Sequence, residues 1–397
     1  MKIEQVAVIG AGTMGASIAM ALAASGYRVL LKDVNDALVQ KGLERVDRMI
    51  ESRKKKGLTD DEAAAQRQRV EGVTDYAKFG GVQLVIEAVV EKIEVKRAVF
   101  ADLDKACTSE CIFGTNTSGL SITQIAAATA RPQRVIGLHF FNPAHIMKLV
   151  EIIPGLDTSE DTVNVSLQFV RSLGKLAVRV EECASFLVNR LLGRYMNEAL
   201  YALQEGSASI DEIDKAVGDY VMPIGPFALR DMNGADIGLA VAKFNFQEYG
   251  ERFKPSPVLA AMVEKNLLGQ KTGKGFYLYD PETKKRSESN REVESLARSL
   301  RNGSRSDEVF DVERLFLAMI NEAFLVLQEK VCAPGDLDPA LEAGLGMRRG
   351  PLKLAQEMGL PECLAKIEAL FETHGERFRP APLLKRYVWG GKKSVVP

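Results

Sequence analysis

The sequence contains few of the residues on which several kinds of protein depend. Its 397 residues include five cysteines, three histidines and one tryptophan. Five cysteines are few and odd in number for a disulfide framework, so we expect a reducing, cytoplasmic compartment. Three histidines argue against a histidine-rich metal site, and no bound metal is expected.

Excess charge and long apolar runs are also missing. The chain has 52 Lys and Arg against 53 Asp and Glu, a net charge of −1, whereas nucleic-acid-binding proteins usually carry a basic excess. Residues 6–24 resemble a signal peptide, but Glu4 precedes them and Gly10, Gly12 and Gly15 interrupt them. No other stretch approaches the roughly 20 apolar residues of a membrane span. We therefore expect neither a nucleic-acid partner nor membrane association.

The first half of the chain alternates between two kinds of apolar pattern. Short apolar runs predict strands, and the longer amphipathic segments between them predict helices. Such alternation is typical of a parallel, doubly wound α/β sheet, which we expect over residues 1–182. The predicted strands are residues 3–9, 27–31, 84–89, 111–114, 135–141, 149–153 and 176–180; the main predicted helices are 14–25, 36–56, 93–106 and 121–128.

The second half of the chain reads as helical and repeats itself. The segment that starts at Asn189 recurs at Glu313, an offset of 124 residues, and Gly225-Pro226 recurs as Gly350-Pro351. Ordered matches of this density indicate a duplicated helical domain. We predict the two copies at 183–280 and 308–397, joined by a charge-rich linker at 281–307 that contains one surface helix.

A glycine motif follows the first predicted strand. In the segment Gly10-Ala-Gly12-Thr13-Met14-Gly15, the glycines permit a tight turn, close approach to a pyrophosphate, and close packing of helix on strand. The helix N-terminus that follows favours negative charge. Asp33 ends the second strand, where a carboxylate accepts from ribose hydroxyls and repels a 2′-phosphate. These features predict a Rossmann-type dinucleotide site that binds NAD rather than NADP.

Two further groups of polar residues follow predicted strands. His139 stands at a strand end, and Glu151 follows in the next strand. A histidine suits proton transfer from an alcohol, and a carboxylate on its other nitrogen would fix the tautomer; a lone histidine at a strand end is also often only structural. Ser118, in the polar turn at 115–120, is either a helix cap or a donor beside a ligand. Residues 54–56, three lysines, are either a solvated helix end or a contact for a phosphorylated ligand.

Several motifs, in order, resemble those of the L-3-hydroxyacyl-CoA dehydrogenase family. The resemblance spans nearly the whole chain and implies a fold with an α/β Rossmann-like doubly wound sheet followed by two repeated all-α domains. The motifs are Val8-Ile-Gly-Ala-Gly-Thr-Met-Gly15, Glu87-Ala-Val-Val-Glu91, Asn116-Thr-Ser118, His139-Phe-Phe-Asn-Pro143, Met147-Lys-Leu-Val-Glu151, Phe186-Leu-Val-Asn189-Arg190, Gly225-Pro-Phe227 and Lys271-Thr-Gly-Lys-Gly-Phe-Tyr277.

The resemblance also implies roles for individual residues. The expected reaction is oxidation of a (3S)-3-hydroxyacyl-CoA to the 3-ketoacyl-CoA, with hydride transfer to NAD. His139 would be the general base, paired with Glu151, while Ser118 and Asn189 would hold the substrate oxygens. Lys56 matches a lysine near the CoA moiety. The residues expected around NAD, besides the glycine motif, are Asp33, Glu91, Lys96, Ser118, Asn142 and Lys271.

Some positions depart from the family pattern, and alternatives remain open. Ser185 stands where Gly is common, His145 where Pro is common, and Gly119 replaces a frequent Ser, which leaves the shape of the acyl pocket open. One alternative is an NAD-dependent dehydrogenase of a free 3-hydroxy acid or sugar acid. Another is a catalytically silent NAD-binding scaffold, which the set Ser118, His139, Glu151 and Asn189 disfavours.

The duplicated helical region also bears on the oligomeric state. The second copy has Glu313 where the first has Asn189, so one chain should carry one active site. In single-copy relatives a partner subunit covers the apolar faces of the helical domain. We therefore expect the second copy to pack on the first and to imitate that dimer contact, giving a monomer or a homodimer.

Overall fold

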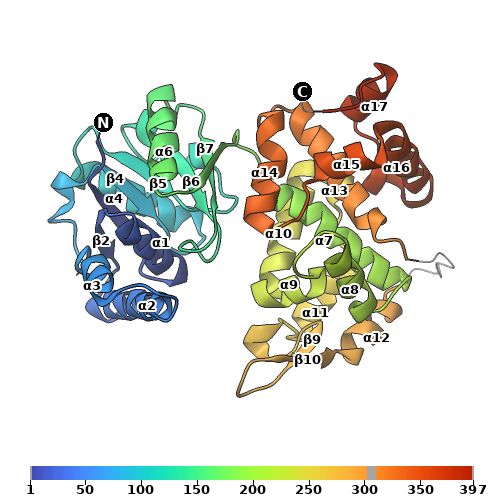
Figure 1. Ribbon diagram of the computed structural model, residues 1–397, viewed down its shortest axis with the longest axis horizontal. Helices are drawn as coiled ribbons and strands as arrows, with labels where there is room; N and C mark the ends of the chain where they lie inside the picture. Colours follow the sequence, from blue (N-terminus) through green and yellow to red (C-terminus); the bar gives the residue numbers. More distant parts are fainter. Residues whose placement is uncertain (1, 302–309, 396–397) are drawn as a thin grey trace. The chain divides into compact units, whose positions relative to one another are not determined.

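The computed structural model describes residues 2–301 and 310–395 and forms two compact units, Met1–Phe186 and Leu187–Pro397 (Figure 1). Each unit has its own core, and the two are described separately. None of the helices within the described residues is both long and apolar enough to cross a membrane.

The first unit is built on one eight-stranded sheet in the order β3-β2-β1-β4-β5-β6-β7-β8. Its strands are buried apolar runs, as expected for a sheet that is covered on both faces. All neighbours are parallel except β6 and β7, which are antiparallel. The strands are β1 (Gln5–Ile9), β2 (Arg28–Lys32), β3 (Val70–Val73), β4 (Leu84–Glu87), β5 (Ile112–Thr115), β6 (Val135–Phe140), β7 (Leu149–Pro154) and β8 (Leu176–Arg179).

Six helices connect these strands. The central one, α1, is rich in alanine and buried along most of its length, because small side chains let it pack close to the sheet. Asn35 caps the next helix through the Leu38 N–H group. The helices are α1 (Thr13–Ala24), α2 (Asp36–Lys54), α3 (Asp60–Gln68), α4 (Ile93–Ala106), α5 (Ile122–Ala126) and α6 (Glu160–Ser172). The predicted doubly wound α/β class is confirmed; β3, α3 and the antiparallel β6–β7 pair were not foreseen.

The second unit is mainly helical, and its helices form two similar series. The first series is α7 (Val188–Glu205), α8 (Ile210–Tyr220), α9 (Pro226–Asn233), α10 (Ala235–Tyr249) and α11 (Pro257–Glu264). The second is α13 (Glu313–Gln328), α14 (Pro334–Leu345), α15 (Pro351–Met358), α16 (Leu360–His374) and α17 (Pro382–Trp389). From α9 and α15 onward the bounds differ by a constant 125 residues, so each residue of one series has a counterpart in the other.

The same hydrogen bonds build the helix starts in both series. Asp214 accepts from the N–H groups of Phe227 and Ala228 at 2.9 and 3.0 Å. Asp338, its counterpart, accepts from Leu352 and Lys353 at 2.9 and 2.8 Å. A carboxylate at a helix N-terminus satisfies N–H groups that have no partner within the helix.

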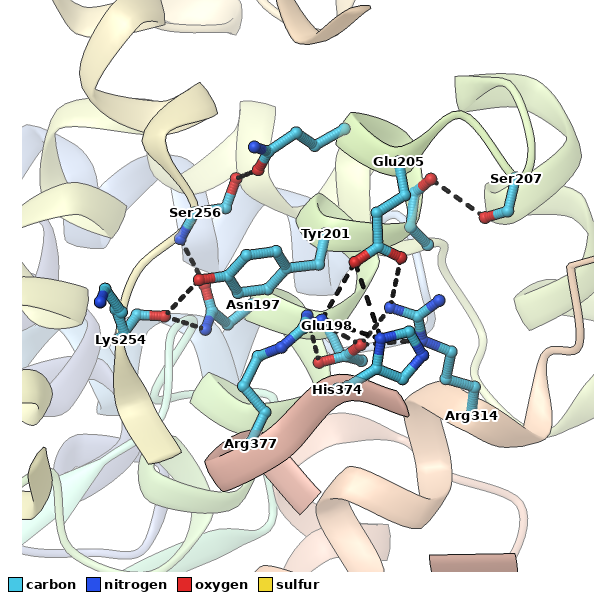
Figure 2. Close-up of polar contacts among 12 residues, drawn as sticks. Asn197, Glu198, Tyr201, Glu205, Ser207, Lys254, Ser256, Arg314, His374 and Arg377 are labelled. Carbon is cyan, nitrogen blue, oxygen red and sulfur yellow. Dashed lines mark hydrogen bonds and ion pairs between the residues drawn. The ribbon is translucent and has the colours of Figure 1, made fainter. Parts of the chain in front are cut away.

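The two series meet through α7 and α13, where buried ion pairs cross in both directions. Arg190 of α7 binds Glu322 of α13 at 2.7 Å, and Arg314 of α13 binds Glu198 of α7 at 2.6 Å. Arginine and glutamate are thus exchanged between equivalent positions, as they would be across a two-fold axis. Figure 2 shows one half of this cluster. Two carboxylates of α7, Glu198 and Glu205, form ion pairs there with Arg314 and Arg377.

The segment expected to be a linker is folded over most of its described length. It contains the end of a hairpin, β9 (Tyr277–Tyr279) with β10 (Arg286–Ser289), and helix α12 (Arg291–Ser299). Val293 and Ala297 of α12 are fully buried, and Gln204 of α7 donates to the Leu300 carbonyl at 2.9 Å. Residues up to 300 therefore pack on the first helical series, and residues 302–307 of the expected linker lie outside the described residues.

Candidate active site

The glycine turn lies between β1 and α1. Gly10 has φ +99°, and a Cβ on Gly15 would stand 1.7 Å from the Gly10 carbonyl oxygen. A Cβ on Gly12, by contrast, would meet nothing within 4 Å, and no side chain caps the N-terminus of α1, which starts at Thr13 and Met14. The turn thus leaves open space in front of unsatisfied N–H groups, which fits the pyrophosphate of a dinucleotide.

Asp33 stands directly after β2 and contacts the glycine turn. Its Oδ2 accepts from the Ala11 N–H at 2.7 Å, and its Oδ1 accepts from the Val34 N–H at 2.7 Å. These bonds fix the carboxylate beside the turn, at the position from which the ribose hydroxyls of a bound dinucleotide are recognised.

A buried ion pair organises the ends of β4 and β5. Glu87 is fully buried and binds the Lys96 ammonium at 2.8 Å and the Thr115 hydroxyl at 2.7 Å. The same ammonium lies 3.2 Å from Glu91, whose carboxylate accepts from the Ser118 N–H at 2.9 Å. Lys96 is 1% exposed, so it acts on the neighbouring site by holding Glu91 rather than as a free cation.

His139 and Glu151 are brought together by the antiparallel pairing of β6 with β7. The register places them directly opposite each other, and His139 Nδ1 lies 2.6 Å from Glu151 Oε2. Their exposed fractions are 4% and 0%. The Phe141 and Phe186 rings lie 4.6 and 5.8 Å from the imidazole ring, centroid to centroid. With Nδ1 committed to the carboxylate, Nε2 is the ring nitrogen that suits proton acceptance.

Asn116 holds the end of β6 in place. Its side-chain oxygen accepts from the Phe140 N–H at 2.8 Å, and its own N–H donates to the Glu87 carbonyl at 2.7 Å. The loop that carries Ser118 is therefore tied to the strand that carries His139. Ser118 is exposed at the carboxyl edge of the sheet, the edge at which open α/β folds bind ligands.

A cationic cavity of about 470 Å³ lies in the first unit beside α1 and α2. Lys56, which the resemblance linked to CoA, lines it together with Arg53, Lys175 and His145, and the described lining residues include no carboxylate. Burial lowers the pKa of His145, and the three cations lower it further. The Ser17 hydroxyl lies 2.8 Å from His145 Nδ1. The cavity therefore suits an anionic group.

The remaining predicted residues are placed as follows. Asn142 is exposed just after β6. Asn189 lies in the first turn of α7, and Lys271 binds Asp236 at 2.5 Å near the start of α10. Asn189 and Lys271 belong to the second unit, so their part in a site with His139 stays a prediction.

Glu87 and Asn116 were not assigned roles from the sequence, although both stand in quoted motifs. Glu87 is the last residue of the buried strand β4, and Asn116 directly follows the buried strand β5. A polar residue at the end of a buried strand is the sequence signal that could have identified both. The contact of Ser17 with His145 joins residues 128 positions apart, so no local pattern could predict it.

Comparison with known proteins identifies the family. Residues 5–183 match the NAD binding domain of 3-hydroxyacyl-CoA dehydrogenase, and residues 186–279 and 310–395 match its C-terminal domain. The fatty acid oxidation complex subunit alpha of Shewanella amazonensis is 35% identical over an alignment of 398 positions, which covers 98% of this chain and 56% of that protein. The chain thus spans about half the length of the curated relatives it matches.

Solved structures agree with this assignment. A 3-hydroxybutyryl-CoA dehydrogenase from Escherichia coli K12 is 31% identical with a TM-score of 0.88, and the match covers 98% of this chain and 99% of that one. The (S)-3-hydroxybutyryl-CoA dehydrogenase PaaH1 of Ralstonia eutropha is 39% identical with a TM-score of 0.68, over 70% of this chain and 100% of that one. The predicted family and the NAD-binding character of the first unit are confirmed: the chain belongs to the 3-hydroxyacyl-CoA dehydrogenase family.

Proposed function

We propose that the chain oxidises a (3S)-3-hydroxyacyl-CoA to the 3-ketoacyl-CoA and passes the hydride to NAD. The observation that carries this proposal is the buried His139–Glu151 pair at the carboxyl edge of the sheet that also carries the glycine turn. An alcohol dehydrogenation needs a base for the hydroxyl proton and an acceptor for the hydride, and this edge offers a place for both.

His139 acts as the base in this mechanism. Nε2 takes the proton of the 3-hydroxyl group as the hydride leaves C3, and the imidazolium that forms is stabilised by the Glu151 carboxylate on Nδ1. Because both side chains are buried, little water screens this interaction. Ser118 and Asn189 are proposed to hold the substrate oxygens, which orients the alcohol for transfer.

NAD fits the residues around the glycine turn. Its pyrophosphate would lie over Gly12 at the N-terminus of α1, and Asp33 would accept from the ribose hydroxyls. NAD supplies the hydride acceptor when bound. Asn142 and Lys271 are proposed to line the same cofactor, while Lys96 holds Glu91 in position beside Ser118.

The cationic cavity supports a CoA thioester over a free hydroxy acid. CoA carries several phosphate charges, and the cavity presents Arg53, Lys56 and Lys175 with His145. A free 3-hydroxy acid or sugar acid carries a single carboxylate charge, fewer charges than the three cations of the cavity would match. We propose that Lys56 and its neighbours bind the phosphates of CoA.

The direct test is NADH formation with 3-hydroxybutyryl-CoA and longer homologues, with NAD and NADP compared. We expect turnover with NAD, strong inhibition by free CoA, and weakening of that inhibition in Lys56→Gln. Lys105→Gln is a matched control, since Lys105 is a surface lysine of α4 in the same unit. Absence of turnover at every chain length would refute the proposal, and turnover insensitive to free CoA would favour the free acid.

For the oligomeric state, we propose that the second helical series replaces a partner subunit, so that one chain needs no obligate dimer. The crossed ion pairs between α7 and α13 support this, because they have the form of a two-fold interface. A chain that ends at residue 300 should aggregate or dimerise. If it stays monomeric, soluble and stable, the idea fails. We also propose a cytoplasmic compartment, with which a small and odd number of cysteines agrees.

A further inference from the structure

His145 lies in the loop between β6 and β7 and is fixed at one ring nitrogen. The Ser17 hydroxyl oxygen of α1 accepts from the His145 backbone N–H at 3.2 Å and lies 2.8 Å from the ring Nδ1. Because this oxygen already accepts one hydrogen bond from His145, its own hydrogen is available to Nδ1, which favours the neutral ring with its hydrogen on Nε2. Nε2 is therefore the nitrogen that remains for a ligand.

The loop that carries His145 is also held from a second side. The Lys175 ammonium, between α6 and β8, donates to the carbonyls of Ala144 and Met147 at 2.7 and 2.6 Å. The Met147 N–H donates to the Pro143 carbonyl at 2.9 Å. Since an ammonium has three hydrogens, Lys175 keeps one for a ligand. The position of the imidazole is thus fixed by protein contacts alone, so a ligand need not order it.

The charged groups that line the cavity with His145 are all cations, within the part of the chain that the structure describes. Arg53 and Lys56 come from the end of α2 and the turn after it, and Lys175 precedes β8, whereas α1 contributes only small, uncharged side chains. Gln66 accepts from Arg53 at 2.9 Å and holds it in place. Burial and the three cations hold the pKa of His145 below its usual 6.5, so the free protein has a neutral imidazole here at pH 7.5.

A phosphate in this cavity would reverse the electrostatic effect on His145. A phosphate monoester is mostly a dianion at pH 7.5, because its second pKa is about 6. A negative charge next to an imidazole favours the imidazolium, and this one would also offset the cations around it. A monoester offers three terminal oxygens, more than either phosphate of a pyrophosphate bridge, and so suits a cavity with several separate donors. CoA carries one such monoester, on the 3′ position of its ribose.

We propose that His145 binds the 3′-phosphate of CoA through Nε2 and takes up a proton from solvent as CoA binds. The inference rests on the proposed function, which places CoA phosphates in this cavity. The imidazolium would donate Nε2–H to the phosphate and Nδ1–H to the Ser17 hydroxyl oxygen. The free protein has the lower pKa at His145 and the complex the higher one. Affinity for CoA should therefore fall as the pH rises between these two values, and it should be independent of His145 above both.

The test is calorimetric titration of the full-length protein with free CoA at pH 7.5, in two non-phosphate buffers of different ionisation enthalpy, which counts the protons exchanged. We expect net proton uptake, and a Kd that rises by about 3- to 10-fold from about pH 7 to about pH 8.5, since one proton changes affinity by at most about tenfold per pH unit. Ionisation of the phosphate itself has the opposite sign, because binding to cations favours loss of its proton.

Two variants isolate the histidine. His145→Gln keeps an N–H donor but cannot become charged, so the proton uptake and the rise in Kd should both disappear. His374→Tyr is the matched control, since it removes a histidine at the end of α16 in the second unit, and its proton uptake should equal that of the unmodified protein. Thermal unfolding of both variants checks that the fold is retained. The ligand 3′-dephospho-CoA, which lacks the monoester, should bind the unmodified protein more weakly and without proton uptake.

The outcomes separate this inference from the proposed function. Proton uptake that persists in His145→Gln belongs to another group, such as Lys175, whose pKa burial also lowers, and overturns the proposal. Equal uptake with 3′-dephospho-CoA would place His145 at the pyrophosphate and contradict it as well. Binding of CoA without proton uptake overturns the role of His145 and leaves the proposed function intact. If CoA does not bind at all, the CoA thioester of the proposed function is itself wrong.

Discussion

Replacing Glu151 with glutamine tests how the structure makes His139 a base. Glu151 Oε2 lies 2.6 Å from His139 Nδ1, and the two side chains are 6% (His139) and 0% (Glu151) exposed. Glutamine has nearly the same shape and keeps a hydrogen-bond acceptor, but it carries no charge. The variant therefore removes the electrostatic part of the interaction and leaves the geometry.

The expected magnitude follows from the distance between the charges. An imidazolium and a carboxylate whose charge centres lie about 4 Å apart interact by about 4 kcal/mol at an effective dielectric constant of about 20. Before proton transfer the imidazole is neutral, so this stabilisation is specific to the transition state and the product. Since each 1.36 kcal/mol changes a rate tenfold, and the amide dipole retains part of the interaction, kcat should fall by about 10²- to 10³-fold.

The assay is initial NADH formation at saturating 3-hydroxybutyryl-CoA, together with a titration of NAD binding. Glu151→Gln should lower kcat and leave NAD affinity unchanged, because Asp33 and the glycine turn are untouched. Glu110→Gln is the control, since this carboxylate forms a surface ion pair with Arg134 in the same unit and is 72% exposed. A kcat of Glu151→Gln close to that of the control would refute the assigned roles of His139 and Glu151.

Three further predictions concern the cofactor and the helical unit. Asp33→Asn should raise the KM for NAD by about tenfold and reduce discrimination against NADP, because the charge that repels a 2′-phosphate is lost; an unchanged ratio between the cofactors would contradict this. Glu198→Gln removes the buried carboxylate shared by Arg314 and Arg377, so the free energy of unfolding in urea should fall by about 3 kcal/mol, whereas a loss typical of a surface pair would refute the importance of the cluster. Burial, followed by the charges of Arg314 and Arg377, holds the pKa of His374 below its usual 6.5 in the folded chain. As the pH falls below 6.5, the unfolded chain takes up this proton more readily than the folded chain, so the free energy of unfolding should fall. The variant His374→Tyr, which introduces the residue of the equivalent position 249 in the first series, should remove that part of the pH dependence. An identical pH profile in the variant would show that His374 is not its source.

The sequence alone determined the features that depend on local pattern. Alternating apolar periods predicted the doubly wound sheet, and the glycine turn with Asp33 predicted the NAD-binding domain, because each of these requires particular residues at fixed spacing. The repeat at an offset of about 125 residues likewise predicted a helical region built from two similar series. Such features can be predicted from the sequence because each depends on residue types at a fixed spacing along the chain.

Tertiary structure decided which distant side chains meet. The antiparallel pairing of β6 with β7 places Glu151 opposite His139; the twelve-residue spacing suggested the pair, but its register depends on the sheet. Burial places Lys96 in ion pairs with Glu87 and Glu91, which the sequence did not indicate, while its expected contact with the cofactor stays a prediction. Register, burial and the pairing of charges depend on contacts between segments far apart in the chain, and no local pattern in a single sequence encodes them.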